Sequence, residues 1–280
     1  MITPDNELNL RLRHPDYQKF LDINEDESIR VKNDYINYLD QSYGKAALQT
    51  LDIFPSNVGD SPILIFIHGG YWRALDKKSY SFVAAPFVKN NFTVCMVNYR
   101  LMPVANMETV LNDVKDAVNW IQEKASQYNG NPNAIVLSGH SAGGHLALMT
   151  YLMNESLRPC IRAICSLSGI FDLNPIKNSY LNEVLNLNEN DVDAFSVSNQ
   201  DLSVLKCPAL LSVGSAETDF FIDQSKDLYT KNKAKAPLTY HEYEQLNHYQ
   251  IVHKLGQEDN PLTQFILQKT KQAITKNSDY

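Results

Sequence analysis

Short apolar runs rich in valine and isoleucine alternate with longer segments of helical period from about residue 49 onward. Apolar runs of about four to eight residues are typical of buried strands, and the longer amphipathic segments between them are typical of covering helices. The alternation therefore predicts an α/β fold, with a mostly parallel twisted sheet and helices on both faces. The predicted strands are residues 49–54, 63–67, 93–99, 134–138, 161–168, 209–213 and 238–243.

Two of the intervening helices can be placed from the same pattern. Over residues 107–128, Val110 and Ile121 belong to one apolar stripe, and Asp113 is predicted on the opposite, exposed face. A second helix is predicted over residues 142–153, directly after an apolar run. We expect the first helix to pack its apolar stripe on the sheet.

Two segments break the alternation. The first 45 residues are polar and predict an N-terminal extension of helix and loop that lies against the outside of the sheet. Residues 171–205 form a long connection rich in asparagine and aspartate. Such long connections inside a compact domain are usually functional, so we expect a lid-like insertion at the mouth of the active site. No repeat or low-complexity linker interrupts the chain, which predicts a single domain over residues 1–280.

Composition narrows the classes of partner. With 280 residues, of which 44% are hydrophobic, the chain can bury one large core. The net charge is −7 and no basic cluster is present, so nucleic acid is not an expected partner. No apolar stretch approaches the roughly 20 residues of a membrane span, and we expect a cytoplasmic protein with no membrane partner. The sequence leaves the oligomeric state open, a homodimer included.

The cysteines show no metal-ligand spacing and no C-x-x-C motif. All of them lie in or beside apolar segments, so they are predicted to be reduced residues of the core. They are Cys95, Cys160, Cys165 and Cys207.

Ser141 lies in the sequence G-H-S-A-G-G at the end of a predicted strand. The pattern G-x-S-x-G between a strand and a helix is typical of a nucleophile elbow, a tight turn that holds one serine outward in a strained conformation. Gly139 and Gly143 are expected there because a side chain would collide with the neighbouring strand or helix. We therefore predict Ser141 as a catalytic nucleophile.

A serine nucleophile needs a base within hydrogen-bond reach and an acid that orients the base. In hydrolases with this elbow the chain order is serine, acid, histidine. His248 directly follows the last predicted strand and is predicted as the base. Glu217 is the carboxylate closest to the end of the preceding strand and is predicted as the acid. Asp219, which is expected to cap the next helix, is the alternative, and Asp223 is a third candidate.

The sequence H-G-G-Y-W after strand 63–67 predicts the donors that hold the developing oxyanion. Gly69 and Gly70 let the backbone approach the reacting oxygen, and the N–H of Ala142, the residue after the nucleophile, completes the predicted oxyanion hole. Tyr71 and Trp72 are the candidates for substrate binding, since a flat ring beside this loop would stack on an aromatic leaving group. The alternative is that they are core aromatics, and we expect at least one of them to line the pocket.

Three further histidines lie in these motifs. His68 is expected to brace the oxyanion loop by hydrogen bonds rather than to titrate. His140 and His145 flank the nucleophile and are expected to pack behind the reacting groups.

The motifs H-G-G-Y-W, G-H-S-A-G-G, N-Y-R-L-M-P at residues 98–103 and N-H-Y-Q-I-V at residues 247–252 occur in this order. With them, and with S-G-I-F-D-L, V-G-S-A-E-T-D-F-F and D-N-P-L-T-Q, the chain resembles the α/β-hydrolase superfamily from about residue 60 to the end. Within that superfamily it resembles the kynurenine formamidases, or arylformamidases. Esterases similar to hormone-sensitive lipase usually carry a third glycine at the position of Tyr71, so H-G-G-Y-W points away from them.

The resemblance implies hydrolysis of the formamide of N-formylkynurenine to kynurenine and formate. It places Glu217 at the position of the triad acid, where the family often carries an aspartate. A formyl group is the smallest acyl group, so specificity is expected on the leaving-group side, where Asp172 and Asn182 are candidates for the polar tail. The reaction uses no cofactor and no metal, and the expected partner is a small-molecule substrate.

Two other functions are compatible with the same residues. A carboxylesterase acting on short acyl or aryl esters would use the same groups, and turnover of N-formylkynurenine against p-nitrophenyl acetate separates the two. A non-catalytic ligand-binding protein on a hydrolase scaffold would keep the pocket without turnover. Such proteins generally lose the nucleophile or the base, whereas Ser141 and His248 are both present here.

Overall fold

A mostly parallel sheet carries the fold in the computed structural model, which describes residues 4–277. Within these residues the sheet has eight strands in the order β1-β2-β4-β3-β5-β6-β7-β8. β2 is antiparallel to both of its neighbours, and every other neighbouring pair is parallel. The strands are β1 (Tyr38–Ser42), β2 (Thr50–Phe54), β3 (Ser61–Ile67), β4 (Thr93–Val97), β5 (Gly130–His140), β6 (Ile161–Leu167), β7 (Ala209–Gly214) and β8 (Leu238–Tyr243).

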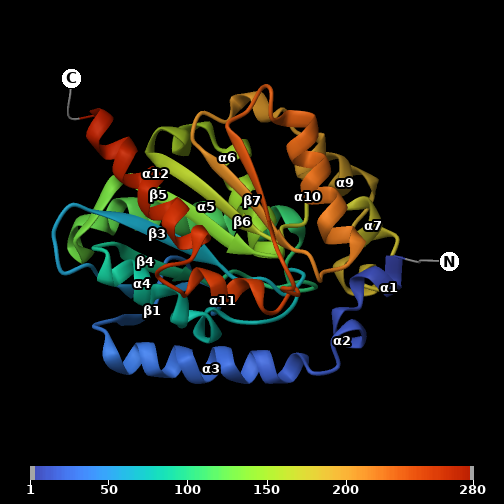
Figure 1. Ribbon diagram of the computed structural model, residues 1–280, viewed down its shortest axis with the longest axis horizontal. Helices are drawn as coiled ribbons and strands as arrows, with labels where there is room; N and C mark the ends of the chain where they lie inside the picture. The colour runs from blue at the N-terminus through green and yellow to red at the C-terminus, as the bar shows by residue number, and fades with distance from the viewer. Residues whose placement is uncertain (1–3, 278–280) are drawn as a thin grey trace.

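Helices cover both faces of the sheet (Figure 1). They are α1 (Pro4–Leu8), α2 (Leu10–Arg13), α3 (Tyr17–Asp34), α4 (Ala84–Lys89), α5 (Met107–Lys124), α6 (Ala142–Met153), α7 (Asn174–Lys177), α8 (Asn182–Leu185), α9 (Glu189–Phe195), α10 (Asp219–Asn232), α11 (Ile251–Leu255) and α12 (Pro261–Asn277). Alternate side chains of β3 point to opposite faces, so Ile65 belongs to one apolar core and Phe66 to another. Helices α5, α6 and α10 close the first core, and α4, α11 and α12 close the second.

The predicted fold class is confirmed, and each predicted strand overlaps an observed one. The hydrophobic pattern missed β1, because this edge strand is mostly exposed and carries no apolar run. The exposed position predicted for Asp113 was wrong. Its carboxylate is fully buried and accepts hydrogen bonds from Arg100 Nη2 at 2.6 Å and Gln49 Nε2 at 2.9 Å.

The polar composition of the first 45 residues predicts that they lie against the outside of the sheet, and this prediction was wrong. β1 joins the sheet itself, and α3 packs beside residues 81–83, where Ser28 Oγ accepts the Phe82 N–H at 3.2 Å. α1 lies beside α10 and α7, and α2 follows it (Figure 1). Leu8 and Leu10 are buried there in the first core. These two leucines are too few to produce a periodic apolar pattern.

Residues 171–205 fold into α7, α8 and α9 with short turns between them. The role of this segment as a lid remains a prediction, and so does the division of the chain into one domain with an extension and an insertion. Because β3 and β5 to β8 are parallel, their carboxyl ends meet at one edge of the sheet. The loops that follow these strands carry the predicted catalytic residues.

Candidate active site

Ser141 occupies a sharp turn between β5 and α6, with φ of 57° and ψ of −121°. This left-handed conformation is costly for a residue with a side chain, and it is held by the packing around the turn. A Cβ on Gly139 would collide with the Gly143 carbonyl, and a Cβ on Gly143 would collide with the Ile67 carbonyl oxygen. The Ser141 N–H donates to the Leu167 carbonyl at 2.8 Å. The local geometry is that of the predicted elbow.

Glu217 and His248 are in direct contact, although 31 residues separate them along the chain. His248 Nδ1 lies 2.6 Å from Glu217 Oε2. The other carboxylate oxygen, Oε1, accepts the Gly214 N–H at 2.7 Å and the Ser168 hydroxyl at 2.5 Å. Both side chains are almost completely buried. Since each carboxylate oxygen has a donor, Glu217 is fixed as an acceptor that orients the imidazole.

The two alternative acids lie elsewhere. Asp219 and Asp223 are exposed on α10, and no hydrogen bond or ion pair joins either of them to His248 within residues 4–270. The N-cap position of α10 belongs to Thr218, so the expected capping role of Asp219 was wrong. Of the three candidate carboxylates, the structure brings only Glu217 to the histidine.

Two aromatic rings lie against the imidazole of His248. The His140 ring lies 4.6 Å from it between centroids, and the Phe221 ring lies 4.3 Å from it. His140 Nε2 also lies 2.9 Å from the His248 carbonyl oxygen. Burial holds the pKa of His140 well below its usual value, so the ring is neutral and donates its Nε2–H to that carbonyl. His140 thus positions both the backbone and the ring of His248.

The predicted oxyanion donors lie close to the nucleophile. A Cβ on Gly69 would be 3.1 Å from Ser141 Cβ, which shows how closely this backbone approaches the elbow. Gly70 has φ of +103° and lines the same cavity as Ser141. Ala142 is the first residue of α6, so its N–H has no acceptor within the helix. The assignment of these three residues to an oxyanion hole remains a prediction.

The two other buried histidines support loops. His68 Nδ1 lies 2.8 Å from the Gly69 carbonyl oxygen, and its ring stacks on Tyr99 at 4.5 Å. His145 Nε2 lies 2.8 Å from the Phe195 carbonyl oxygen. Burial lowers the pKa of each histidine to about 4. Both rings are therefore neutral near pH 7 and act as hydrogen-bond donors to the backbone.

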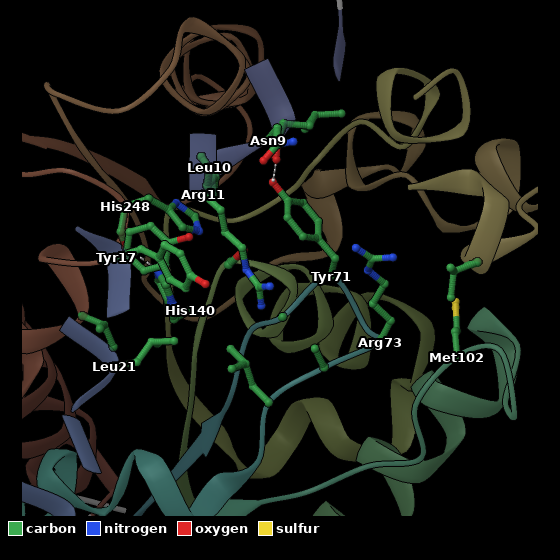
Figure 2. A pocket seen from close by; sticks show the side chains of 18 of the residues that line it. Asn9, Leu10, Arg11, Tyr17, Leu21, Tyr71, Arg73, Met102, His140 and His248 are labelled. Carbon is green, nitrogen blue, oxygen red and sulfur yellow. Dashed lines mark hydrogen bonds between the residues drawn. The ribbon is translucent and has the colours of Figure 1, made fainter. Parts of the chain in front are cut away.

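A cavity of about 530 Å³ opens above the elbow, and Ser141 and His248 both line it. Figure 2 shows His248 among the residues of its wall. Much of its wall comes from the N-terminal segment, including Leu8, Arg11 and Tyr17. The segment is attached by the Tyr71 hydroxyl, which donates to the Leu8 carbonyl at 3.0 Å. The first residues of the chain therefore cover the candidate active site rather than the back of the sheet.

The predicted substrate-binding residues divide into two groups. Tyr71 lines the cavity, whereas Trp72 is fully buried and packs edge-on against His145 at 5.1 Å, away from the cavity wall. Asp172 and Asn182 do not line the cavity either. Their side-chain oxygens accept nearby backbone N–H groups, so they stabilise turns of the insertion. Trp72 is a core aromatic that lies next to the oxyanion loop in the sequence. The sequence alone does not distinguish such a residue from one that lines the pocket.

Several residues of the cavity were missed in the sequence. Tyr180 and Val184 come from residues 171–205, and Tyr249 directly follows the predicted base. Arg73 directly follows H-G-G-Y-W, so its place in the oxyanion loop could have indicated it. Arg11 lies in a segment without any motif, and nothing in the sequence pointed to it.

Comparisons with known proteins agree with this fold. A family model described as BD-FAE matches residues 51–231. The kynurenine formamidase of Danio rerio is 31% identical over 240 residues, which cover 82% of this chain and 80% of that protein. A solved structure from Silicibacter sp. matches with a TM-score of 0.83 at 24% identity, covering 95% of this chain and 99% of that chain. An esterase of Pyrobaculum calidifontis matches with a TM-score of 0.74 at 16% identity, covering 94% of this chain and 97% of that chain. These structural likenesses show the α/β-hydrolase fold.

Proposed function

Since this chain belongs to the kynurenine formamidase family of α/β-hydrolases, we propose that it hydrolyses N-formylkynurenine to kynurenine and formate. Its relatives show that the chain is a hydrolase. The proposal concerns which bond it cleaves and which residues act on that bond. The observation that carries it is the hydrogen bond of 2.6 Å between Glu217 and His248, at the wall of the cavity that Ser141 also lines.

In the proposed reaction, Ser141 Oγ attacks the formyl carbon while His248 Nε2 takes the hydroxyl proton. Glu217 accepts the Nδ1–H of His248, which leaves Nε2 free to act as the base. The oxyanion is held by the N–H groups of Gly69, Gly70 and Ala142, and each such donor typically contributes about 3 kcal/mol.

The tetrahedral intermediate collapses when the carbon–nitrogen bond breaks and His248 protonates the departing aryl amine. Ser141 then carries a formyl ester. A water molecule, deprotonated by His248, attacks this ester, and formate leaves as the serine regains its proton. A formyl group needs little space, so the cavity of about 530 Å³ supports a leaving group with a ring and a tail.

Formate release from N-formylkynurenine, compared with acetate release from p-nitrophenyl acetate, tests the proposal. We expect both reactions to be lost in Ser141→Ala, together with stoichiometric labelling by a fluorophosphonate. A negligible formamide rate beside rapid ester turnover would reassign the chain to the carboxylesterases. Absence of labelling in the wild type would favour a ligand-binding protein without catalysis.

The location and assembly of the protein belong to the same proposal. We propose a cytoplasmic enzyme, which is supported by four cysteines that are buried and unpaired. Over the residues that the structure describes, no helix has the length and apolar character needed to cross a bilayer. The proposed mechanism takes every residue from one chain, so it operates with or without a homodimer.

A further inference from the structure

The charged side chains that line the cavity are both arginines. Arg11 comes from α2 in the N-terminal segment, and Arg73 comes from the oxyanion loop. No aspartate or glutamate belongs to the cavity lining among residues 4–270. In a chain with net charge −7, a cavity lined by two cations and no anion is a specific local arrangement.

The contacts around Tyr71 place the two arginines at the wall of the same cavity. The Tyr71 hydroxyl binds the Leu8 carbonyl, three residues before Arg11. The Arg73 N–H donates to the Gly70 carbonyl at 3.1 Å, in the turn that also contains Tyr71. Figure 2 shows the two guanidinium groups on either side of Tyr71.

Each guanidinium group is braced by an aromatic ring and has no charged partner. Arg11 Cζ lies 5.1 Å from the centre of the Tyr17 ring, and Arg73 Cζ lies 5.9 Å from the centre of the Tyr180 ring. Desolvation raises the pKa of Tyr180, and the positive charges of Arg73 and Arg11 both oppose this rise. Both guanidinium groups therefore interact electrostatically with the same phenol. Within residues 4–270, neither guanidinium forms an ion pair or a side-chain hydrogen bond.

The acidic side chains near the cavity are already engaged by backbone donors. Asp5 Oδ1 accepts the Tyr180 N–H at 2.8 Å, and Glu7 Oε2 accepts the Phe220 N–H at 3.0 Å. Glu217 is held behind His248. None of these carboxylates forms an ion pair with Arg11 or Arg73 among residues 4–270, so the guanidinium N–H groups can bind an anion in the cavity.

We propose that Arg11 and Arg73 bind a carboxylate on the leaving group, so that the enzyme selects aryl formamides or esters with a carboxylate in the tail. This inference rests on the proposed function, because it concerns the substrate of the same site. A carboxylate bound by two guanidinium groups forms charge-assisted hydrogen bonds that a neutral tail cannot form. We expect the carboxylate to raise kcat/KM by about ten- to a hundred-fold over a neutral analogue.

The test compares N-formylkynurenine with its methyl ester, in which a neutral ester replaces the carboxylate of the tail, and measures formate release. The wild type should prefer the free carboxylate. Arg11→Gln and Arg73→Gln should each reduce the preference, and the double variant should abolish it. Arg30→Gln is the matched control, because Arg30 is exposed on α3 and does not line the cavity. Its preference should equal that of the wild type.

A binding measurement separates the two proposals. Calorimetric titration of Ser141→Ala with kynurenine and with kynurenine methyl ester needs no turnover. If no formate is released but the carboxylate binds more tightly and this difference disappears in the double arginine variant, the proposed reaction is wrong and the inference holds. If formate is released at equal rates from both substrates, or both ligands bind equally or not at all, the inference is overturned.

Discussion

Replacing Glu217 by glutamine should lower kcat by about a thousand- to ten-thousand-fold, because only a carboxylate accepts all the hydrogen bonds that meet there. Oε1 accepts the Gly214 N–H and the Ser168 hydroxyl, and Oε2 accepts from His248. An amide has one oxygen. The Gly214 N–H is a donor that cannot rotate, so the amide oxygen must stay beside it and the NH2 group must face His248.

The magnitude follows from the tautomer that this geometry forces. With an NH2 group opposite, His248 must present a bare Nδ1 and carry its proton on Nε2, where it cannot accept the proton of Ser141. The same tautomer error costs a serine protease about 10⁴-fold in kcat, which corresponds to about 5.5 kcal/mol in the activation barrier. If the amide turned the other way, its NH2 group would meet the buried Gly214 N–H, and the protein would lose about 1–3 kcal/mol of stability.

Initial rates of formate release, measured together with Tm, distinguish these outcomes. Asp219→Asn is the matched control, since Asp219 is an exposed acid two residues along the chain. We expect its kcat to stay within about threefold of the wild type, as for ordinary surface substitutions. Glu217→Gln with a kcat within tenfold of the wild type, or a larger loss in Asp219→Asn, would refute the assignment of the acid.

Three further predictions concern the turn, the N-terminal segment and pH. Gly143→Ala should lower Tm by several degrees and reduce kcat, because its Cβ collides with a carbonyl oxygen of β3; an unchanged Tm in calorimetry would contradict the packing argument. Tyr71→Phe removes the hydrogen bond to Leu8 and should raise KM about fivefold with little change in kcat; steady-state kinetics showing the opposite split would exclude this role. His68 and His145 have a pKa of about 4 in the folded chain, against 6.5 for a histidine in the unfolded chain. At a pH between these two values the unfolded chain therefore binds more protons than the folded chain. The free energy of unfolding should therefore fall as pH decreases through that window, with uptake of protons on unfolding by these two histidines and by His140, whose pKa burial also lowers; urea midpoints that stay constant from about pH 7 to 4.5 would disprove it.

The sheet and the reacting groups could be predicted because their signals are local or follow from chain order. Gly139 and Gly143 are required where the elbow brings backbones together, and the same crowding is seen in the structure. Glu217 and His248 were found from the order of the strands, since the carboxyl ends of parallel strands meet at one edge. Such features need no knowledge of distant packing.

The positions of other residues depend on contact partners that cannot be identified from the sequence. Asp113 is buried only because Arg100 and Gln49, from other parts of the chain, supply donors to its carboxylate. Trp72 is adjacent to the oxyanion loop in sequence, but its ring packs against His145 in the core. Arg11 reaches the cavity because the polar N-terminal segment folds over it. Each of these outcomes is decided by tertiary contacts, which periodicity and motifs do not report.

The site thus divides its tasks between two parts of the chain. The groups proposed to act on the bond follow strands of the sheet, where the parallel strands fix their positions. Much of the remaining cavity wall comes from the N-terminal segment and from the loop after β3, with Tyr180 and Val184 added by residues 171–205. Substitutions in these covering segments can change the charge and shape of the cavity without moving Ser141, Glu217 or His248. Members of one fold can therefore keep the hydrolytic residues while their substrates differ, and substrate preference has to be argued from residues such as Arg11 and Arg73 rather than from the elbow.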